Sequence, residues 1–331
     1  MAEPKAPAVR RVVIDEGSEG QRLDNFLVKL LKGVPKAHVY RVIRSGEVRV
    51  NKGRADADTR LELGDEVRVP PVRVADRADA PAAPAREFAV VHEDDFLLAI
   101  NKPAGVAVHG GSGVSSGVIE QLRRARPGAK FLELVHRLDK ETSGLLLIAK
   151  KRSALVALQD QLRARETGKT YAALVIGAWP ASRKVIDVAL HKFVTGDGER
   201  RVQAVAEDAG RRSITLVRVA RTLPGYSLLD VTIKTGRTHQ IRVHMKHLGH
   251  PIAVDELYGD PAPILLSTIK KKFRLGKFTE EERPLMTRLA LHAWQLQFKD
   301  QQGVAHQLEA PLPKDLQAVL SQLRKHKRQQ A

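Results

Sequence analysis

The chain has 331 residues, enough for two domains of ordinary size, and 43% of them are hydrophobic, which excludes an extensively disordered protein. It contains no cysteine, so disulfides, thiol nucleophiles, zinc ribbons and iron–sulfur clusters are excluded. Lys and Arg number 56 against 38 Asp and Glu, and the net charge of +18 predicts a polyanionic partner, usually a nucleic acid. No apolar run reaches the roughly 18 residues of a membrane span, and Met1–Arg11 lack the apolar core of a signal peptide. We therefore expect a cytoplasmic protein without a membrane partner.

Residues 20–75 predict a small domain of two short helices followed by a hairpin-like sheet. Apolar residues recur at helical spacing in Leu23–Leu31, and Ala37–Ser45 predicts a second helix that ends at a glycine. Valines alternate with charged residues at 48–50 and again at 67–69, which is typical of strands.

This small domain carries an excess of positive charge. Between Arg22 and Arg73 there are 12 Lys and Arg against 7 Asp and Glu. Such residues either contact phosphates or form a solvated charged surface, and charge alone does not decide between the two. The segments RLDNFL, VYRVIRSGEVRVN and LELGDEVRV, in this order, resemble the S4 RNA-binding domain, which favours RNA. The expected RNA contacts are Lys36, Arg41, Arg44, Arg49 and Lys52.

An Ala/Pro-rich stretch at 76–87 predicts a linker to a larger unit at 88–320, and the basic segment 321–331 predicts a frayed tail. The larger unit mixes strands and helices without a regular βαβ rhythm. We expect an α+β fold with a mixed, mostly antiparallel sheet and flanking helices. The expected strands are 88–91, 97–100, 145–149, 171–176, 214–219 and 227–233.

One carboxylate stands out in the larger unit. Asp139 lies in a polar segment between two apolar stretches, two residues after Arg137 and shortly before Gly144. A lone loop carboxylate is more often a turn residue than a reactive group. Loops on a rigid sheet nevertheless display most reactive groups, and glycine lets the backbone approach a ligand closely. The residues alone therefore leave a turn and a catalytic role open.

Five segments of the larger unit resemble the RluA-type pseudouridine synthases. The signature HRLDKETSG stands at 136–144 and is preceded by NKPAGVAVHGG at 101–111. It is followed by GKTYAALV at 168–175, TGRTHQIRVHMKHLGHPI at 235–252 and RLALHA at 288–293. The order of an S4 domain, a linker and a synthase domain is most similar to members that act on large-subunit ribosomal RNA. One departure is visible: relatives commonly have Gly-Asp after this HPI segment, where this chain has Val254-Asp255.

The resemblance assigns roles to three residues of a catalytic site. Asp139 is the catalytic carboxylate, Tyr171 supplies a flat face for the uracil, and Arg242 is the cationic partner that keeps a buried carboxylate ionised. Arg242 falls on a predicted helix, Thr238–Leu248, capped by Thr238. Because it lies off the apolar stripe of that helix, we expect its side chain to point away from the core.

The resemblance also implies two RNA contacts near the site. Arg137 is two residues from Asp139, so on an extended strand both would point to one side, and in the family this arginine displaces the flipped base. Lys102, in the first of the five segments, is expected to contact a phosphate.

The implied activity is isomerisation of uridines to pseudouridine in 23S ribosomal RNA, either free or in a ribosome assembly intermediate. The reaction needs no cofactor and no metal, and we expect a monomer. The alternatives are a transfer RNA substrate, a different ribosomal site, or an RNA-binding module without activity. The glycines at 111–117 do not match a dinucleotide fingerprint or a P-loop, because the third glycine is one place late and no Gly-Lys-Ser/Thr follows. The spacing of four histidines argues against zinc: His239, His244, His247 and His250.

Overall fold

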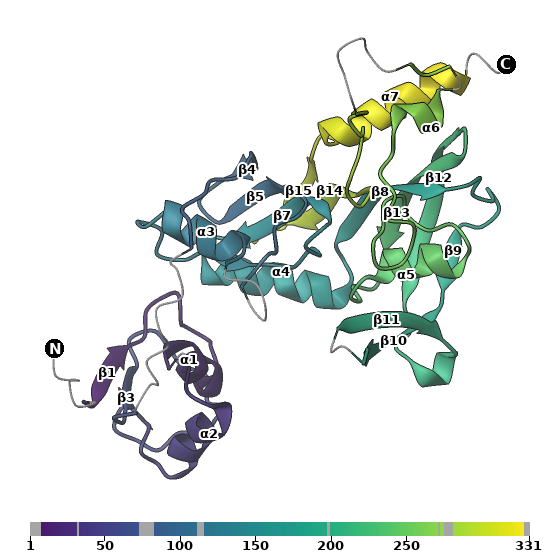
Figure 1. The fold of residues 1–331 in the computed structure, drawn as a ribbon. Helices are drawn as coiled ribbons and strands as arrows, with labels where there is room; N and C mark the ends of the chain where they lie inside the picture. Colours follow the sequence, from purple (N-terminus) through teal and green to yellow (C-terminus); the bar gives the residue numbers. More distant parts are fainter. Residues whose placement is uncertain are drawn as a thin grey trace.

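The computed structural model of the chain contains a small N-terminal unit that lies beside a larger unit (Figure 1). The structure describes residues 8–31, 33–72, 83–110, 116–196, 199–270, 272–274 and 281–327. Residues 76–82 of the predicted linker and most of the glycine-rich segment at 111–117 lie outside these ranges.

The small unit confirms the two predicted helices and adds a third strand to the predicted hairpin. Its elements are β1 (Arg10–Val13), α1 (Leu23–Leu30), α2 (Lys36–Arg44), β2 (Arg49–Val50) and β3 (Glu66–Val69). The strands are antiparallel in the order β1-β3-β2. The first strand escaped prediction because its side chains are largely exposed and carry no clear alternation of apolar residues.

The larger unit is built on one sheet of ten strands in the order β4-β5-β7-β14-β8-β13-β12-β9, in which β6 also pairs with β7 and β15 also pairs with β14. Every pair in this sheet is antiparallel except β7 with β14, which confirms a mixed, mostly antiparallel sheet. A separate hairpin of β10 and β11 extends below α5 (Figure 1). The strands are β4 (Val90–Glu93), β5 (Leu97–Lys102), β6 (Glu133–Leu134), β7 (Ser143–Ala149), β8 (Gly168–Ile176), β9 (Val185–Asp187), β10 (Ala189–Val194), β11 (Arg200–Val205), β12 (Ile214–Leu223), β13 (Tyr226–Ile233), β14 (Leu291–Lys299) and β15 (Ala305–Glu309).

Helices cover both faces of this sheet. Alternate residues of β7 point to opposite sides, so Leu145 and Leu147 pack in one cluster with α4 while Leu146 and Ile148 pack in another with α3 and α7. The helices are α3 (Val118–Ala125), α4 (Arg152–Ala164), α5 (Gln240–His247), α6 (Leu266–Ile269) and α7 (Lys314–Lys327). Helix α7 continues past the predicted domain boundary at 320 and buries Leu323. The prediction of a frayed tail is therefore wrong for the residues up to Lys327.

The parallel pair at the middle of the sheet depends on one glycine. Strands β7 and β14 pair through two positions, His292 with Ser143 and Ala293 with Gly144. A Cβ at Gly144 would lie 2.2 Å from the carbonyl oxygen of Ala293, and Gly144 has a φ of +114°. Only glycine permits this approach of the two backbones.

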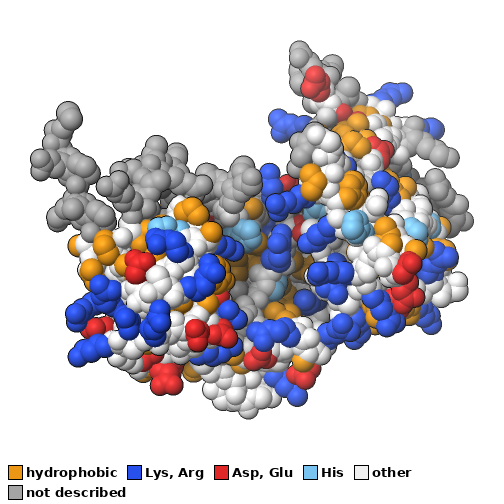
Figure 2. Space-filling view, turned by 90° about the horizontal axis from the view of Figure 1, so that it is seen from below, with side chains coloured by type: hydrophobic (Ala, Val, Ile, Leu, Met, Phe, Trp, Pro, Cys, Tyr) orange, Lys and Arg blue, Asp and Glu red, His pale blue; other side chains and the backbone are white. Residues whose placement is uncertain are grey.

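The small unit contacts the larger one at the short strand β6. Lys29 Nζ lies 2.8 Å from Glu133 Oε1, and Arg123 binds the other oxygen of Glu133 at 2.9 Å. The face seen in Figure 2 is hollowed near its centre and has many Lys and Arg side chains around the hollow, as the net charge predicts.

Candidate active site

A cleft of about 160 Å³ opens where the loop before β7, strand β8 and the start of α5 meet. Asp139 lies in that loop, between β6 and β7, with 22% of its side chain exposed. The predicted loop position between two strands is confirmed. Asp139, Tyr171 and Arg242, the three residues predicted to form the site, all line this cleft.

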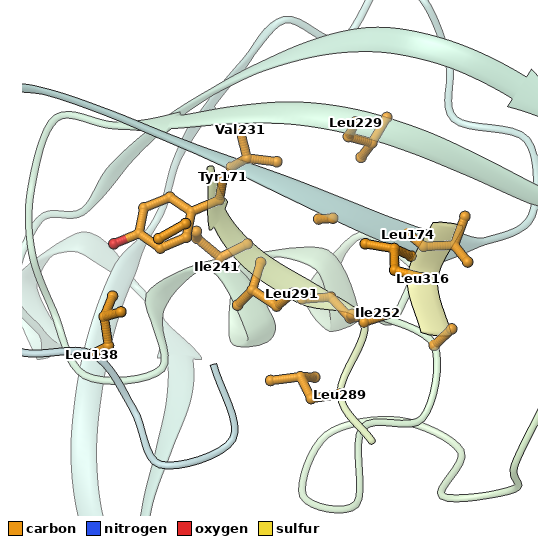
Figure 3. Close-up of a cluster of buried hydrophobic side chains, with 14 of the residues drawn as sticks. Leu138, Tyr171, Leu174, Leu229, Val231, Ile241, Ile252, Leu289, Leu291 and Leu316 are labelled. Carbon is orange, nitrogen blue, oxygen red and sulfur yellow. The ribbon is translucent and has the colours of Figure 1, made fainter. Parts of the chain in front are cut away.

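Tyr171 forms one wall of the cleft. It is 7% exposed and its ring packs among Val231, Ile241 and Leu291, with the hydroxyl directed away from these side chains (Figure 3). Burial raises the pKa of Tyr171, and the charge of Asp139 raises it further, so the hydroxyl keeps its proton. The tyrosine therefore presents an aromatic surface and a neutral hydroxyl to a ligand in the cleft.

Arg242 corrects the prediction in two respects. Its side chain is buried, 4% exposed, rather than directed away from the core, and its ion-pair partner is Asp255 rather than Asp139. Nε lies 2.9 Å from Oδ2 of Asp255, and Nη2 lies 2.5 Å from Oδ1. Burial lowers the pKa of Arg242, but the hydrogen bonds and charge of Asp255, with a smaller contribution from Asp139, raise it above its ordinary value. The cleft thus has a permanent positive charge at its floor, fixed in a bidentate pair.

Asp255 is held by the backbone as well as by Arg242. Its Oδ1 accepts hydrogen bonds from the amides of Leu257 and Tyr258, at 3.0 and 3.1 Å, and the residue is fully buried. The preceding Val254 has a φ of +56° and is 3% exposed. A β-branched residue in this left-handed region is strained, so valine makes this loop conformation more costly than glycine would.

His239 is a residue of the cleft that the sequence brought forward only as a zinc candidate. It replaces Thr238 as the residue that caps α5, with a φ of +51°. Its Nε2 lies 4.0 Å from Oδ1 of Asp139, and its Nδ1 lies 2.8 Å from the hydroxyl of Tyr258. That hydroxyl also accepts from the amide of Val202. Burial lowers the pKa of His239 although Asp139 opposes the shift, so a neutral imidazole lies beside the carboxylate.

The other histidines of the predicted alternative bind separate partners. His244 contacts the Thr215 hydroxyl and the Val188 carbonyl, and His250 contacts the carbonyl of Ile176. Among the described residues, no group of three or more His, Asp or Glu side chains is placed to hold a metal ion.

Lys102 does not contact phosphate as predicted. It is fully buried, and its Nζ donates to the carbonyls of Pro103 and Val106 at 2.8 Å and of Lys140 at 3.0 Å. Burial lowers its pKa to about 8. Because Lys140 follows Asp139 directly, Lys102 ties the end of β5 to the loop that carries the carboxylate.

Arg137 is exposed at the mouth of the cleft, but it lies in a loop rather than on the strand from which its direction was predicted. The basic residues of the small unit lie on its surface: Lys36, Arg41, Arg44 and Lys52 are exposed, and Arg49 is partly exposed. Arg41 lies 3.5 Å from Glu47. Their contact with RNA stays a prediction.

Comparison with known proteins shows the family of the chain. The family described as RNA pseudouridylate synthase matches residues 96–247, and the S4 domain matches residues 21–67. The ribosomal large subunit pseudouridine synthase C of Haemophilus influenzae is 46% identical to this chain over 97% of each protein. The protein of the same name from Escherichia coli (strain K12) is 46% identical over 97% of this chain and 98% of its own.

Solved structures show the same fold. Human RNA pseudouridylate synthase domain containing 4 superposes with a TM-score of 0.56 at 28% identity, over 71% of this chain and 93% of the human chain. Human RNA pseudouridylate synthase domain containing 1 gives a TM-score of 0.52 at 26% identity, over 69% and 84%. The chain belongs to the RNA pseudouridine synthase family, and it is an isomerase with an N-terminal S4 domain. No helix in the described part of the chain is long and apolar enough to cross a membrane.

Proposed function

We propose that the protein isomerises specific uridines of large-subunit (23S) ribosomal RNA, free or in a ribosome assembly intermediate, and that Asp139 is its catalytic residue. The observation that carries this proposal is the meeting of Asp139, Tyr171 and Arg242 in one cleft of a chain that matches large-subunit synthases over 97% of its length. The S4 domain and the net charge of +18 support an RNA partner.

The reaction requires the uridine to leave the stacked RNA, at a cost of a few kcal/mol that contacts in the cleft offset. The bond between C1′ of the ribose and N1 of the uracil breaks, the base turns, and C1′ joins C5. The proton of C5 leaves and N1 gains one, so the product is an isomer and no redox partner is consumed. Positive charge develops on the sugar as the first bond breaks, and a carboxylate at that position stabilises it.

The described residues fit these needs. Tyr171 lies beside Asp139 and offers its ring as a surface for the uracil while it turns. Arg242, held by Asp255, brings a guanidinium to the cleft that Asp139 lines, and Nε2 of His239 lies 4.0 Å from Oδ1 of Asp139. To Arg137, an exposed residue that lines the same cleft, we assign the displacement of the flipped base. We propose a monomeric enzyme that works in the cytoplasm with its ribosomal substrate.

The test replaces Asp139 by Asn, a near-isosteric amide that cannot carry the negative charge. We expect the single-turnover rate on 23S RNA fragments to fall by several decades while RNA binding is retained. Pseudouridine is measured by mass spectrometry, and Asp95→Asn, at an exposed position, is the matched control. A rate above about a tenth of wild type, a barrier change under ~1.4 kcal/mol, would contradict the assignment. Transfer RNA in parallel reactions tests the alternative substrate.

A further inference from the structure

A second cavity of about 200 Å³ adjoins the catalytic cleft and is lined by positive charges. It shares Lys169, Ile233, Gly236 and Arg237 with the cleft, so these residues form a common border of the two spaces. No Asp or Glu lines it. We name it the basic pocket, after its cationic residues Arg163, Arg165, Lys169, Lys234 and Arg237.

Lys169 is the residue that joins the two cavities. It stands two positions before Tyr171 on β8, so both side chains leave the strand on the same side. Among the described residues its ammonium has no hydrogen-bond or ion-pair partner, and burial lowers its pKa. A Cβ at Gly236 would lie 3.9 Å from Nζ, so the ammonium lies close to a backbone that carries no side chain. The chain thus holds a partly buried cation without a counter-charge at the edge of the cleft.

The remaining cations of the basic pocket are also largely unbalanced. Arg165, Lys234 and Arg237 are exposed and make no ion pair with any residue that the structure describes, whereas Arg163 pairs with Asp160. Arg165 ends α4 in the left-handed region, with a φ of +63°. Charges of one sign that converge on a cavity repel one another, and an anion in the cavity relieves that repulsion.

We propose that the basic pocket binds a phosphodiester of the RNA strand next to the uridine that enters the cleft. This inference rests on the proposed function. A nucleotide that turns into the cleft stays tethered by the phosphates on either side of it, and these must lie at the cleft mouth. The basic pocket opens at that mouth, so one phosphate reaches Lys169 and Arg237 while the base lies against Tyr171. Lys169 therefore positions the nucleotide by its backbone, independently of sequence.

The experiment uses the full chain and a short RNA that the wild-type enzyme modifies. Each phosphate within three nucleotides of the target uridine is replaced in turn by an uncharged methylphosphonate. We expect the wild-type enzyme to lose about tenfold in affinity at one linkage, the effect of one charge-assisted contact. The Lys169→Met variant should bind unmodified RNA about tenfold more weakly than wild type does. Its affinity should not fall further when the methylphosphonate stands at that linkage. Its log Kd should also depend less steeply on log[salt], by roughly 0.7.

Lys184→Met, at an exposed position, is the matched control and should respond to every methylphosphonate as wild type does. Arg237→Gln, also exposed, repeats the test at a position where misfolding is not at issue. At each linkage, the loss of RNA affinity from Lys169→Met or Arg237→Gln is compared with the loss from the methylphosphonate. If the two losses are additive at every linkage, the basic pocket does not bind the RNA backbone. Absence of pseudouridine with wild-type enzyme and unmodified RNA would instead refute the proposed function, so the two failures are distinguishable.

Discussion

Replacing Asp255 by Asn tests whether the Arg242–Asp255 pair holds the floor of the cleft together. The carboxylate accepts two hydrogen bonds from the guanidinium and two from backbone amides, and neither partner of the pair is more than 4% exposed. Asn can still accept from the amides and from Nη2 of Arg242 through its oxygen, but its NH₂ group replaces Oδ2 and faces the Nε–H donor of Arg242. The substitution therefore removes the counter-charge and leaves the shape almost unchanged.

Breaking a buried pair by removing one charge costs about 3–5 kcal/mol, because the other charge stays buried without compensation. We expect Asp255→Asn to lower the free energy of unfolding of the larger unit by this amount, and Arg242→Met to have an effect of the same order. The double variant has no buried charge and keeps the acceptor for the amides, so it should recover at least ~2 kcal/mol relative to the sum of the two losses.

Urea unfolding followed by tryptophan fluorescence measures these changes. Both tryptophans, Trp179 and Trp294, lie in the larger unit, so the signal excludes the small one. The double variant should stay inactive although it is stable, because the positive charge near Asp139 is gone. Single losses below about 1 kcal/mol, or losses that simply add in the double variant, would refute the role given to the pair.

Two further predictions concern acid and salt. Burial lowers the pKa of His244 and His292 to about 4. Between about pH 6.5 and 4 these histidines therefore bind protons in the unfolded chain but not in the folded chain, so the free energy of unfolding decreases as the pH falls through this range. Each histidine should lower the free energy of unfolding at pH 5 by roughly 2 kcal/mol, measured by urea unfolding at pH 7 and pH 5. An equal urea midpoint at the two pH values would contradict this prediction. Changing Arg41, Arg44 and Lys52 to Ala should reduce the slope of log K against log[salt] by roughly 0.7–0.9 for each phosphate that the variant no longer neutralises, with turnover at saturating RNA retained. Lower saturating turnover with an unaltered slope would place the small unit in catalysis instead.

Local patterns made part of the site predictable. A polar segment between apolar strands placed Asp139 in a loop, and the expected strand 171–176 placed Tyr171 on the sheet. The Arg242–Asp255 pair was not predictable, because α5 is enclosed on more sides than its apolar stripe indicates, and a residue beyond the helix supplies the counter-charge. One local signal was available for Lys169: on a strand, it shares a side with Tyr171.

Charge and apolar alternation are poor guides at two other places in the chain. Lys102 has the charge of a surface residue, and nothing in its neighbours shows that two carbonyls of the turn after β5 and one of the Asp139 loop will surround its ammonium. Strand β14 lies in the middle of the sheet, yet its sequence, LHAWQLQFK, mixes His and Gln with apolar residues, and only the resemblance of RLALHA marked its beginning. Its partner strands come from segments far apart in the chain, so this segment forms a strand because of tertiary contacts and not because of its local sequence.

The pairing of β7 with β14 gives the sheet a mechanical consequence. Strands β4 to β7 form one half and the remaining strands of the sheet form the other, and among the described residues the backbone pairing of β7 with β14 joins the halves through two residue pairs. Asp139 precedes the first half, whereas Tyr171 and the loop to α5 belong to the second. Any flexing at this narrow joint changes the separation between the carboxylate and the tyrosine ring. A methyl group at Gly144 would clash with the backbone of Ala293 and push β7 away from β14. The alignment of the reacting groups therefore depends on a residue that never touches the RNA base.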